Sequence, residues 1–228
     1  MTISEPAGTR VAIVFHSGFG HTANQAEAVA RGARSMPGTH VDLLQVEEPH
    51  DALLATLDQA DAIIFGTPTY MGAASAAFKQ FSESTSKAWG DDLRWSGKVA
   101  AGFTNSQNIN GNKENTLLEL VVLAAQHGMH WVSLGLYGGW NTTTGSPEDL
   151  NRLGAFTGAM AQSHGDAGPD QAPPSSDLAT AEHLGRRVAQ TAAELKRGRA
   201  AAPPAAASPS AEPTADEQTA YVNATTDR

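Results

Sequence analysis

VAIVFHSGFGHTANQA, residues 11–26, carries the features that decide the fold. Its first five residues are all apolar, which is typical of a strand covered on both faces of a sheet. Two glycines, hydroxyls and imidazoles follow, and a stretch with helical character begins at about Thr22. A strand that ends in a small-residue loop and runs directly into a helix is the repeating unit of a parallel sheet, so the stretch predicts an α/β fold.

The rest of the chain repeats this alternation of apolar runs and helix-like stretches. Five strands are predicted, at 11–15, 41–46, 62–66, 99–104 and 131–137, and five helices, at 22–35, 51–60, 73–88, 112–126 and 177–197. Ser175 or Ser176 would be the N-cap of the last helix. Right-handed crossovers then predict a flavodoxin-like doubly wound parallel five-stranded sheet of order 2-1-3-4-5, with helices on both faces.

Composition sets the boundaries of the domain and excludes several classes of function. Residues 11–198 are predicted to form one domain, between a flexible leader at 1–10 and a disordered Ala/Pro-rich tail at 199–228. The net charge of −9 argues against nucleic-acid binding, and the absence of Cys excludes disulfides, thiolate nucleophiles and Cys-ligated metals. No apolar stretch is long enough for a membrane span and no signal peptide is recognisable, so a cytoplasmic protein is expected.

The loop after the first strand predicts a phosphate site. In doubly wound sheets ligands bind at the carboxyl ends of the strands, near the switch between the first and third strands. Residues 17–22 combine small residues and hydroxyls at a helix N-terminus, where backbone N–H groups and the helix dipole favour an anion. The loop matches neither the Walker A pattern nor the dinucleotide G-x-G-x-x-G pattern. A tight turn with Thr22 as a plain cap remains the alternative.

Two further strand ends carry polar or aromatic residues. Residues 66–72 include Pro68, expected to end its strand, Gly72, expected to adopt an unusual backbone angle, and Tyr70 and Met71, whose side chains suit contact with a planar ring. Residues 104–112 offer amides and hydroxyls but no ionisable group, which suits a polar, uncharged ring edge. Ordinary turns and loops would explain both stretches equally well.

Three motifs recur in the order and spacing of a known family. Residues 17–22 (SGFGHT), 66–72 (GTPTYMG) and 126–129 (QHGM) together resemble the flavodoxin-like NAD(P)H:quinone oxidoreductases of the WrbA type and the related NADPH-dependent FMN reductases. The resemblance covers about residues 11–198. It implies non-covalent FMN at the switch point, with NADH or NADPH as co-substrate.

The resemblance also implies roles for individual residues. His127 would stabilise negative charge on the reduced ring, although as a helix-terminal residue before Gly128 it could merely cap that helix. Phe19 and Trp89 would line the pocket where nicotinamide or quinone stacks. No metal site is expected, because the histidines lack a metal-binding spacing. The implied FMN-binding residues are Ser17, Gly18, Phe19, Gly20, His21, Thr22, Pro68, Thr69, Tyr70, Met71, Gly72, Thr104, Asn105, Ser106, Gln107, Asn108 and His127.

The leading hypothesis is therefore an FMN-dependent oxidoreductase that transfers hydride from NAD(P)H to a quinone, a flavin or a similar small acceptor. Alternatives are a flavodoxin-type electron carrier without NAD(P)H turnover, a pathway-specific quinone or flavin reductase, and a partner-binding protein without enzymatic activity. Family resemblance also implies a homodimer or homotetramer. The long segment 138–175 would serve as a pocket lid or subunit contact, with a disordered surface loop as the alternative.

Overall fold

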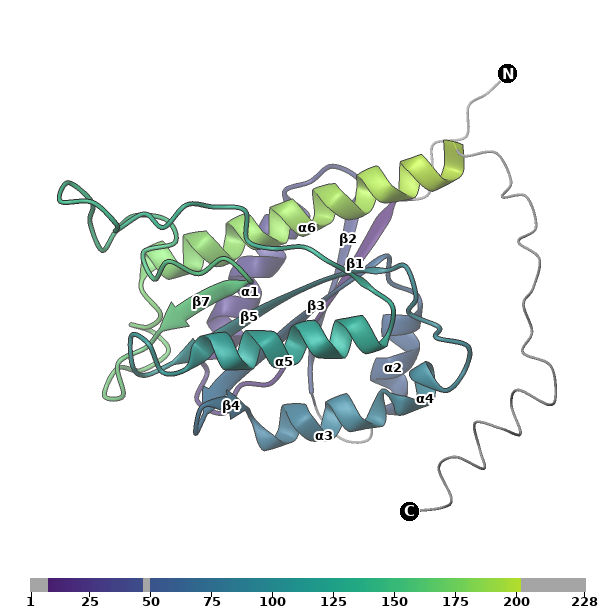
Figure 1. Ribbon diagram of the computed structural model, residues 1–228, viewed down its shortest axis with the longest axis horizontal. Coiled ribbons are helices and arrows are strands. Elements are labelled where there is room, and N and C mark those ends of the chain that lie inside the picture. Colours follow the sequence, from purple (N-terminus) through teal and green to yellow (C-terminus); the bar gives the residue numbers. More distant parts are fainter. Residues whose placement is uncertain (1–7, 47–49, 202–228) are drawn as a thin grey trace, which may run out of the picture. The chain divides into compact units, whose positions relative to one another are not determined.

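The predicted strand order is confirmed in the computed structural model, which describes residues 8–46 and 50–201 (Figure 1). The sheet has the order β2-β1-β3-β5-β6, in which β5 and β6 are the fourth and fifth predicted strands. All neighbours along this path are parallel, while the short β4 forms an antiparallel hairpin with β3. The strands are β1 Thr9–Phe15, β2 Thr39–Gln45, β3 Ala62–Tyr70, β4 Ala73–Ala74, β5 Val99–Ser106, β6 His130–Trp131 and β7 Ala159–Gln162.

Helices cover both faces of the sheet, as predicted. Side chains of α1 and α6 pack on one face, and side chains of α2, α3, α4 and α5 on the other. No helix within the described ranges is long and apolar enough to cross a membrane. The helices are α1 His21–Arg34, α2 Asp51–Asp58, α3 Ala76–Ser84, α4 Ser86–Trp89, α5 Lys113–Gln126 and α6 Ser175–Ala201.

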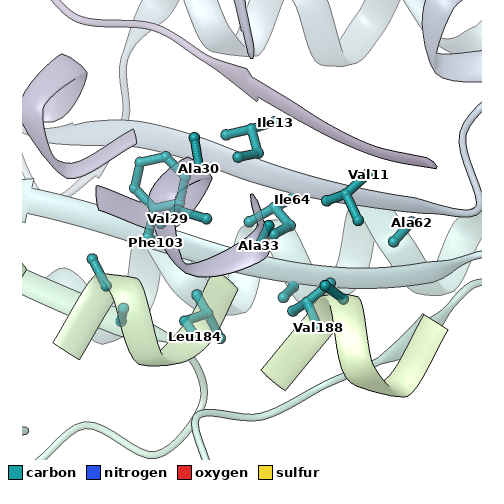
Figure 2. Close-up of a cluster of buried hydrophobic side chains, with 14 of the residues drawn as sticks. Val11, Ile13, Val29, Ala30, Ala33, Ala62, Ile64, Phe103, Leu184 and Val188 are labelled. Atoms are coloured by element: carbon teal, nitrogen blue, oxygen red, sulfur yellow. The ribbon is translucent and has the colours of Figure 1, made fainter. Parts of the chain in front are cut away.

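The core follows from the alternation of side chains along the strands. Val11 and Ile13 of β1 point toward α1 and α6, as Figure 2 shows, whereas Ala12 and Val14 point toward the other helical layer. The helices α1 and α6 cross so closely that a Cβ placed on Gly185 would collide with the Val29 carbonyl oxygen. This close crossing buries the apolar faces of both helices.

The fifth strand is split, which corrects the prediction of a continuous strand at 131–137. Only His130 and Trp131 pair with the start of β5, and β7 pairs with its end, from Phe103↔Ala159 to Ser106↔Gln162. The chain leaves the sheet between them as an excursion, residues 132–158. The Trp131 indole N–H donates to the Thr157 carbonyl at 2.9 Å and so joins the two ends of the excursion.

Several predicted boundaries also change. Pro68 does not end its strand, because β3 continues to Tyr70; beyond Gly66 its only parallel neighbour is β5, an edge position that tolerates proline. Thr9 and Arg10 belong to β1 rather than to the leader, and α6 includes 199–201 of the predicted tail. Ser175 and Ser176 lie inside α6, so neither is its N-cap. Residues 1–7 and 202–228, the rest of the predicted leader and tail, lie outside the described residues.

Candidate functional site

The loop between β1 and α1 presents unused backbone donors. Gly20, with φ 85°, is the N-cap residue of α1 and has no side chain that could cap the helix. Thr22 lies inside α1, so it is not the N-cap. The Ser17 hydroxyl instead accepts a hydrogen bond from the Ala23 N–H at 3.1 Å. Among the described residues, the N–H groups from Phe19 to Thr22 have no recorded acceptor. Such donors at the positive end of a helix can bind a phosphate.

The turn between β3 and β4 lies beside this loop. Met71 and Gly72 have φ of 50° and 84°, which makes a two-residue hairpin turn and confirms the unusual angle expected at Gly72. The phenol oxygen of Tyr70 accepts a hydrogen bond from the Gly18 backbone, and its ring packs edge-on against Phe19, with centroids 6.3 Å apart. The Met71 and Phe19 side chains are exposed. This arrangement leaves an apolar surface next to the unused donors.

His16 makes a second link between the same two segments. Its Nδ1 lies 2.8 Å from the Ser75 hydroxyl, and this hydroxyl caps α3 by accepting from the Phe78 N–H. Burial lowers the pKa of His16, which favours the neutral ring at neutral pH. His16 therefore joins the end of β1 to the start of α3.

Two predicted FMN contacts use their side chains inside the protein instead. The Thr69 hydroxyl lies 2.8 Å from the hydroxyls of Thr104 and Thr116, and Thr104 donates to the Thr67 carbonyl at 2.7 Å. Thr69 and Thr104 are both buried. Their hydroxyls join β3, β5 and α5, so direct side-chain contact with a ligand is not supported for them.

The end of β5 is organised by a lysine. Asn105 and Ser106 belong to the strand rather than to a loop, and their side chains bond to Ser163 and to the Asn108 carbonyl. Lys113, the first residue of α5, donates to the Ser106 hydroxyl and to the carbonyl oxygens of Asn108 and Ile109. The Gln107 and Asn108 side chains remain exposed at this edge.

A buried ion pair holds the excursion and β7 to α6. The Arg152 guanidinium makes two 2.8 Å bonds to the Asp177 carboxylate, which also accepts from the Gln162 N–H at 2.8 Å. Asn151 donates to the Ala155 carbonyl, while its own N–H donates to the Thr180 hydroxyl. These bonds order the excursion, so a disordered surface loop is not what the structure contains at 138–158.

The segment 163–172, which follows β7, lies against the phosphate loop. His21 Nε2 is 2.9 Å from the Ala167 carbonyl, and Asn24 donates to the carbonyls of Pro169 and Ala172. A Cβ on Gly20 would lie 2.9 Å from Pro169. A cavity of about 620 Å³ opens between this segment and the end of β5, lined by Gln107, Asn108, Ile109, Gln162, His164, Gly165 and Asp166. The segment therefore forms a fourth wall of the site.

Within one chain His127 lies outside this constellation, and the role predicted for it at the flavin stays a prediction. It caps the C-terminus of α5 at the amino edge of the sheet, about 23 Å from the carboxyl edge if β5 rises about 3.3 Å per residue. Because Thr85 donates to the Ser82 carbonyl, His127 Nε2 is the donor in its 2.9 Å bond to Thr85. Its ring packs on Trp95 and is buried, which lowers its pKa. Within one chain His127 is a core histidine.

Trp89 is likewise remote from Phe19, so the two do not line one pocket within a chain. It lies on α4 at the amino edge, half-exposed, beside a groove of about 760 Å³ between α3, α4 and α5. The exposed Leu118 and Val122 and the buried His127 also line this groove. The groove has both apolar and polar lining and is separate from the phosphate loop.

Sequence reasoning missed Lys113, Arg152 and Asp177 as parts of the site, whereas the segment 163–172 belongs to the stretch 138–175 that was predicted to be a pocket lid or subunit contact. One signal was available: Lys113 is a cation at a predicted helix N-terminus, where the helix dipole disfavours positive charge. The exact place of the segment 163–172 was not predictable, because it depends on the splitting of the fifth strand.

Comparisons with known proteins identify the relatives of this chain. Residues 20–138 match the family described as NADPH-dependent FMN reductase. The chain is 42% identical over 187 residues to "Flavodoxin FldP" of Pseudomonas aeruginosa, which covers 82% of this chain and 98% of that protein. It is 34% identical over 215 residues to the "NAD(P)H dehydrogenase (quinone)" of Aromatoleum aromaticum, covering 84% of this chain and all of that one. The crystal structure of a "flavodoxin, WrbA-like protein" from Agrobacterium tumefaciens superposes with a TM-score of 0.64 at 40% identity, covering 82% and 99%.

Proposed function

Because the chain belongs to the NADPH-dependent FMN reductase family, we propose that it is an FMN-dependent oxidoreductase that transfers hydride from NADH or NADPH to a quinone or a similar small acceptor. The observation that carries the proposal is the set of unused N–H groups from Phe19 to Thr22 at the start of α1. FMN, when bound, supplies the hydride chemistry, while the protein supplies orientation and electrostatics.

The residues present fit the phosphate of FMN. A phosphate dianion needs hydrogen-bond donors rather than acceptors. The Ser17 hydroxyl oxygen already accepts a hydrogen bond from the Ala23 N–H. Gly18 and Gly20 keep the loop small enough for close approach, since a Cβ on either would meet Tyr70 or Pro169. We therefore keep residues 17–22 as the phosphate-binding residues.

The isoalloxazine ring and the ribityl chain are assigned to the neighbouring segments. Pro68, Tyr70, Met71 and Gly72 offer backbone and apolar surface on one side, and Gln107 and Asn108 offer exposed amides on the other. The side chains of Thr69, Thr104, Asn105 and Ser106 are engaged within the protein, so they are not assigned to the ring. Phe19, three-quarters exposed above Tyr70, suits stacking of the second reactant.

A flavodoxin-type electron carrier is the second candidate function. It is favoured by the 42% identity to a protein named as a flavodoxin. The two functions differ in one respect: a reductase takes electrons directly from NAD(P)H, whereas a carrier takes them from a protein partner.

The groove between α3, α4 and α5 supports a homo-oligomer. Its rim exposes Leu118, Val122 and Trp89, three large apolar side chains that a second copy of the chain would bury. A role for Trp89 in lining the substrate pocket would require the site of a second copy, since Trp89 and Phe19 do not line one pocket within a chain. The cytoplasmic location expected from the sequence stays a prediction.

The phosphate assignment is tested by Ser17→Asp and its neutral match Ser17→Asn. Either side chain can still accept from the Ala23 N–H, so both variants should fold. The carboxylate would repel the phosphate, and FMN titration should show at least about a hundredfold weaker binding for Ser17→Asp than for Ser17→Asn. Equal affinity for FMN in the two variants would contradict the assignment.

A further inference from the structure

Lys113 is a fully buried ammonium at the carboxyl edge of the sheet. Its Nζ lies 2.9 Å from the Ser106 hydroxyl and 2.7 Å from each of the Asn108 and Ile109 carbonyl oxygens. The Ser106 hydroxyl donates its hydrogen to the Asn108 carbonyl, so its oxygen accepts a hydrogen bond from Lys113. Three acceptors require three hydrogens, and this geometry therefore belongs to the charged form of the side chain.

The loop is built closely around this ammonium. Gly111 has φ 55°, and a Cβ there would collide with the Ser106 hydroxyl. Asn112 follows in the left-handed region, with φ 55°, and leads into α5. Both residues hold backbone that most side chains disfavour, and the result is a short loop that encloses Nζ.

The location of this charge is unfavourable for stability. Lys113 is the first residue of α5, where the helix dipole opposes a cation, and burial lowers its pKa to about 8. Among the described residues, Asp177 of α6 raises the pKa of Lys113 and so favours the ammonium, whereas Arg152 of the excursion lowers it. Since Arg152 and Asp177 neutralise each other, the buried cluster keeps one net positive charge.

We propose that Lys113 is a positioning residue that holds the 106–109 loop against the flavin and supplies the buried positive charge that favours its reduced state. The inference rests on the proposed function, which assigns Gln107 and Asn108 to the polar edge of the ring. Reduction adds negative charge to that edge, and a cation bonded to the same loop stabilises it. Lys113 thus fills the electrostatic role that the family resemblance implied for His127.

The test is the midpoint potential of FMN bound to the full-length protein, for wild type, Lys113→Met and the matched control Lys98→Met. Lys98, which is partly buried, is likewise bonded to backbone carbonyls, those of Asp58 and Ala60, but it lies at the amino edge. Removing the charge of Lys113 should lower the preference for reduced over oxidised FMN about tenfold, or about 30 mV for a two-electron couple. Lys98→Met should leave the potential unchanged.

A purely structural lysine would give a different result. Lys113→Met would then lower the thermal stability and weaken the binding of oxidised and reduced FMN equally, with no change in potential, and the proposal would be overturned. Lys113→Gln, which keeps a hydrogen-bond donor without the charge, should shift the potential in the same direction. If the wild-type protein bound no FMN, the proposed function and this inference would both fail; an unshifted potential defeats the inference alone.

A measurement on the unaltered protein covers the case in which neither variant folds. The difference in potential between bound and free FMN should become more negative between pH 7 and pH 9, because Lys113, whose pKa burial lowers to about 8, loses its proton over this range. A difference that stays constant over this range would overturn the proposal.

Discussion

Replacing Asp177 by Asn removes the charge of the buried ion pair and keeps the size of the side chain. The Asp177 side chain is 1% exposed and that of Arg152 8% exposed, so water cannot compensate the guanidinium once the carboxylate is gone. The asparagine NH₂ would also face a donor, because all three bonds to the carboxylate come from N–H groups of Arg152 and Gln162.

The expected loss follows from this geometry. Breaking a buried ion pair by neutralising one partner costs about 3–5 kcal/mol, whereas an exposed pair is worth about 0–1 kcal/mol. Asp42→Asn is the matched control, because the Arg10–Asp42 pair is 43% and 22% exposed. We expect Asp177→Asn to lower the free energy of unfolding by about 3 kcal/mol and Asp42→Asn by less than about 1 kcal/mol.

The assay is urea unfolding of the FMN-free protein, followed by far-UV circular dichroism, because bound ligand would mask part of the loss. The m-value should stay constant while the midpoint falls. Asp177→Asn should also weaken FMN binding, since Asp177 holds the end of β7 that leads into the segment 163–172. Equal losses for the two variants, or a loss below about 1 kcal/mol for Asp177→Asn, would refute the reasoning.

Three further outcomes are expected. Gly185→Ala should lower the free energy of unfolding by about 1–3 kcal/mol or more, because its Cβ would collide with the Val29 carbonyl; Gly198→Ala, whose Cβ meets nothing within 4 Å, should not. The free energy of unfolding should fall as the pH drops below about 6.5, by up to about 1.4 kcal/mol per pH unit for each histidine involved. The reason is that burial lowers the pKa of His127 in the folded state, so that only the unfolded chain takes up the proton in this range. His127→Gln should reduce this loss in urea unfolding. Deleting residues 202–228 should leave FMN affinity and turnover unchanged, and a large loss of either would show that this stretch contributes to the site.

The fold was predictable because its signals are local. Runs such as Val11–Phe15 are apolar on both faces, and the loop after each run has a composition that ends a strand. The split of the fifth strand was not predictable, because residues 132–137 have the composition of a strand. Their place beside β5 is taken by a later stretch, which rejoins the sheet at Gly158, where a Cβ would collide with the Gly102 carbonyl. That contact joins residues 56 positions apart and has no local signature.

Some parts of the site were likewise predictable from the sequence and others were not. The phosphate loop lies next to β1 in the sequence, so its composition identified it. His127 and Trp89 were placed by resemblance, and within one chain both lie at the opposite edge of the sheet, because α5, and α3 followed by α4, run back toward that edge. The place of Lys113 at a predicted helix N-terminus was a signal, but its role was not predictable, since that role depends on a loop that folds back over Nζ.

The central claim is direct reduction of bound FMN by a pyridine nucleotide, and anaerobic visible spectroscopy tests it most directly. The FMN-loaded protein is mixed with one equivalent of NADH or of NADPH, and a quinone is added afterwards. We predict that the flavin absorbance bleaches with at least one of the two donors and returns when the quinone is added. Flavin that binds but stays oxidised with both donors would contradict the reductase and favour the electron carrier, and a protein that binds no FMN would contradict both.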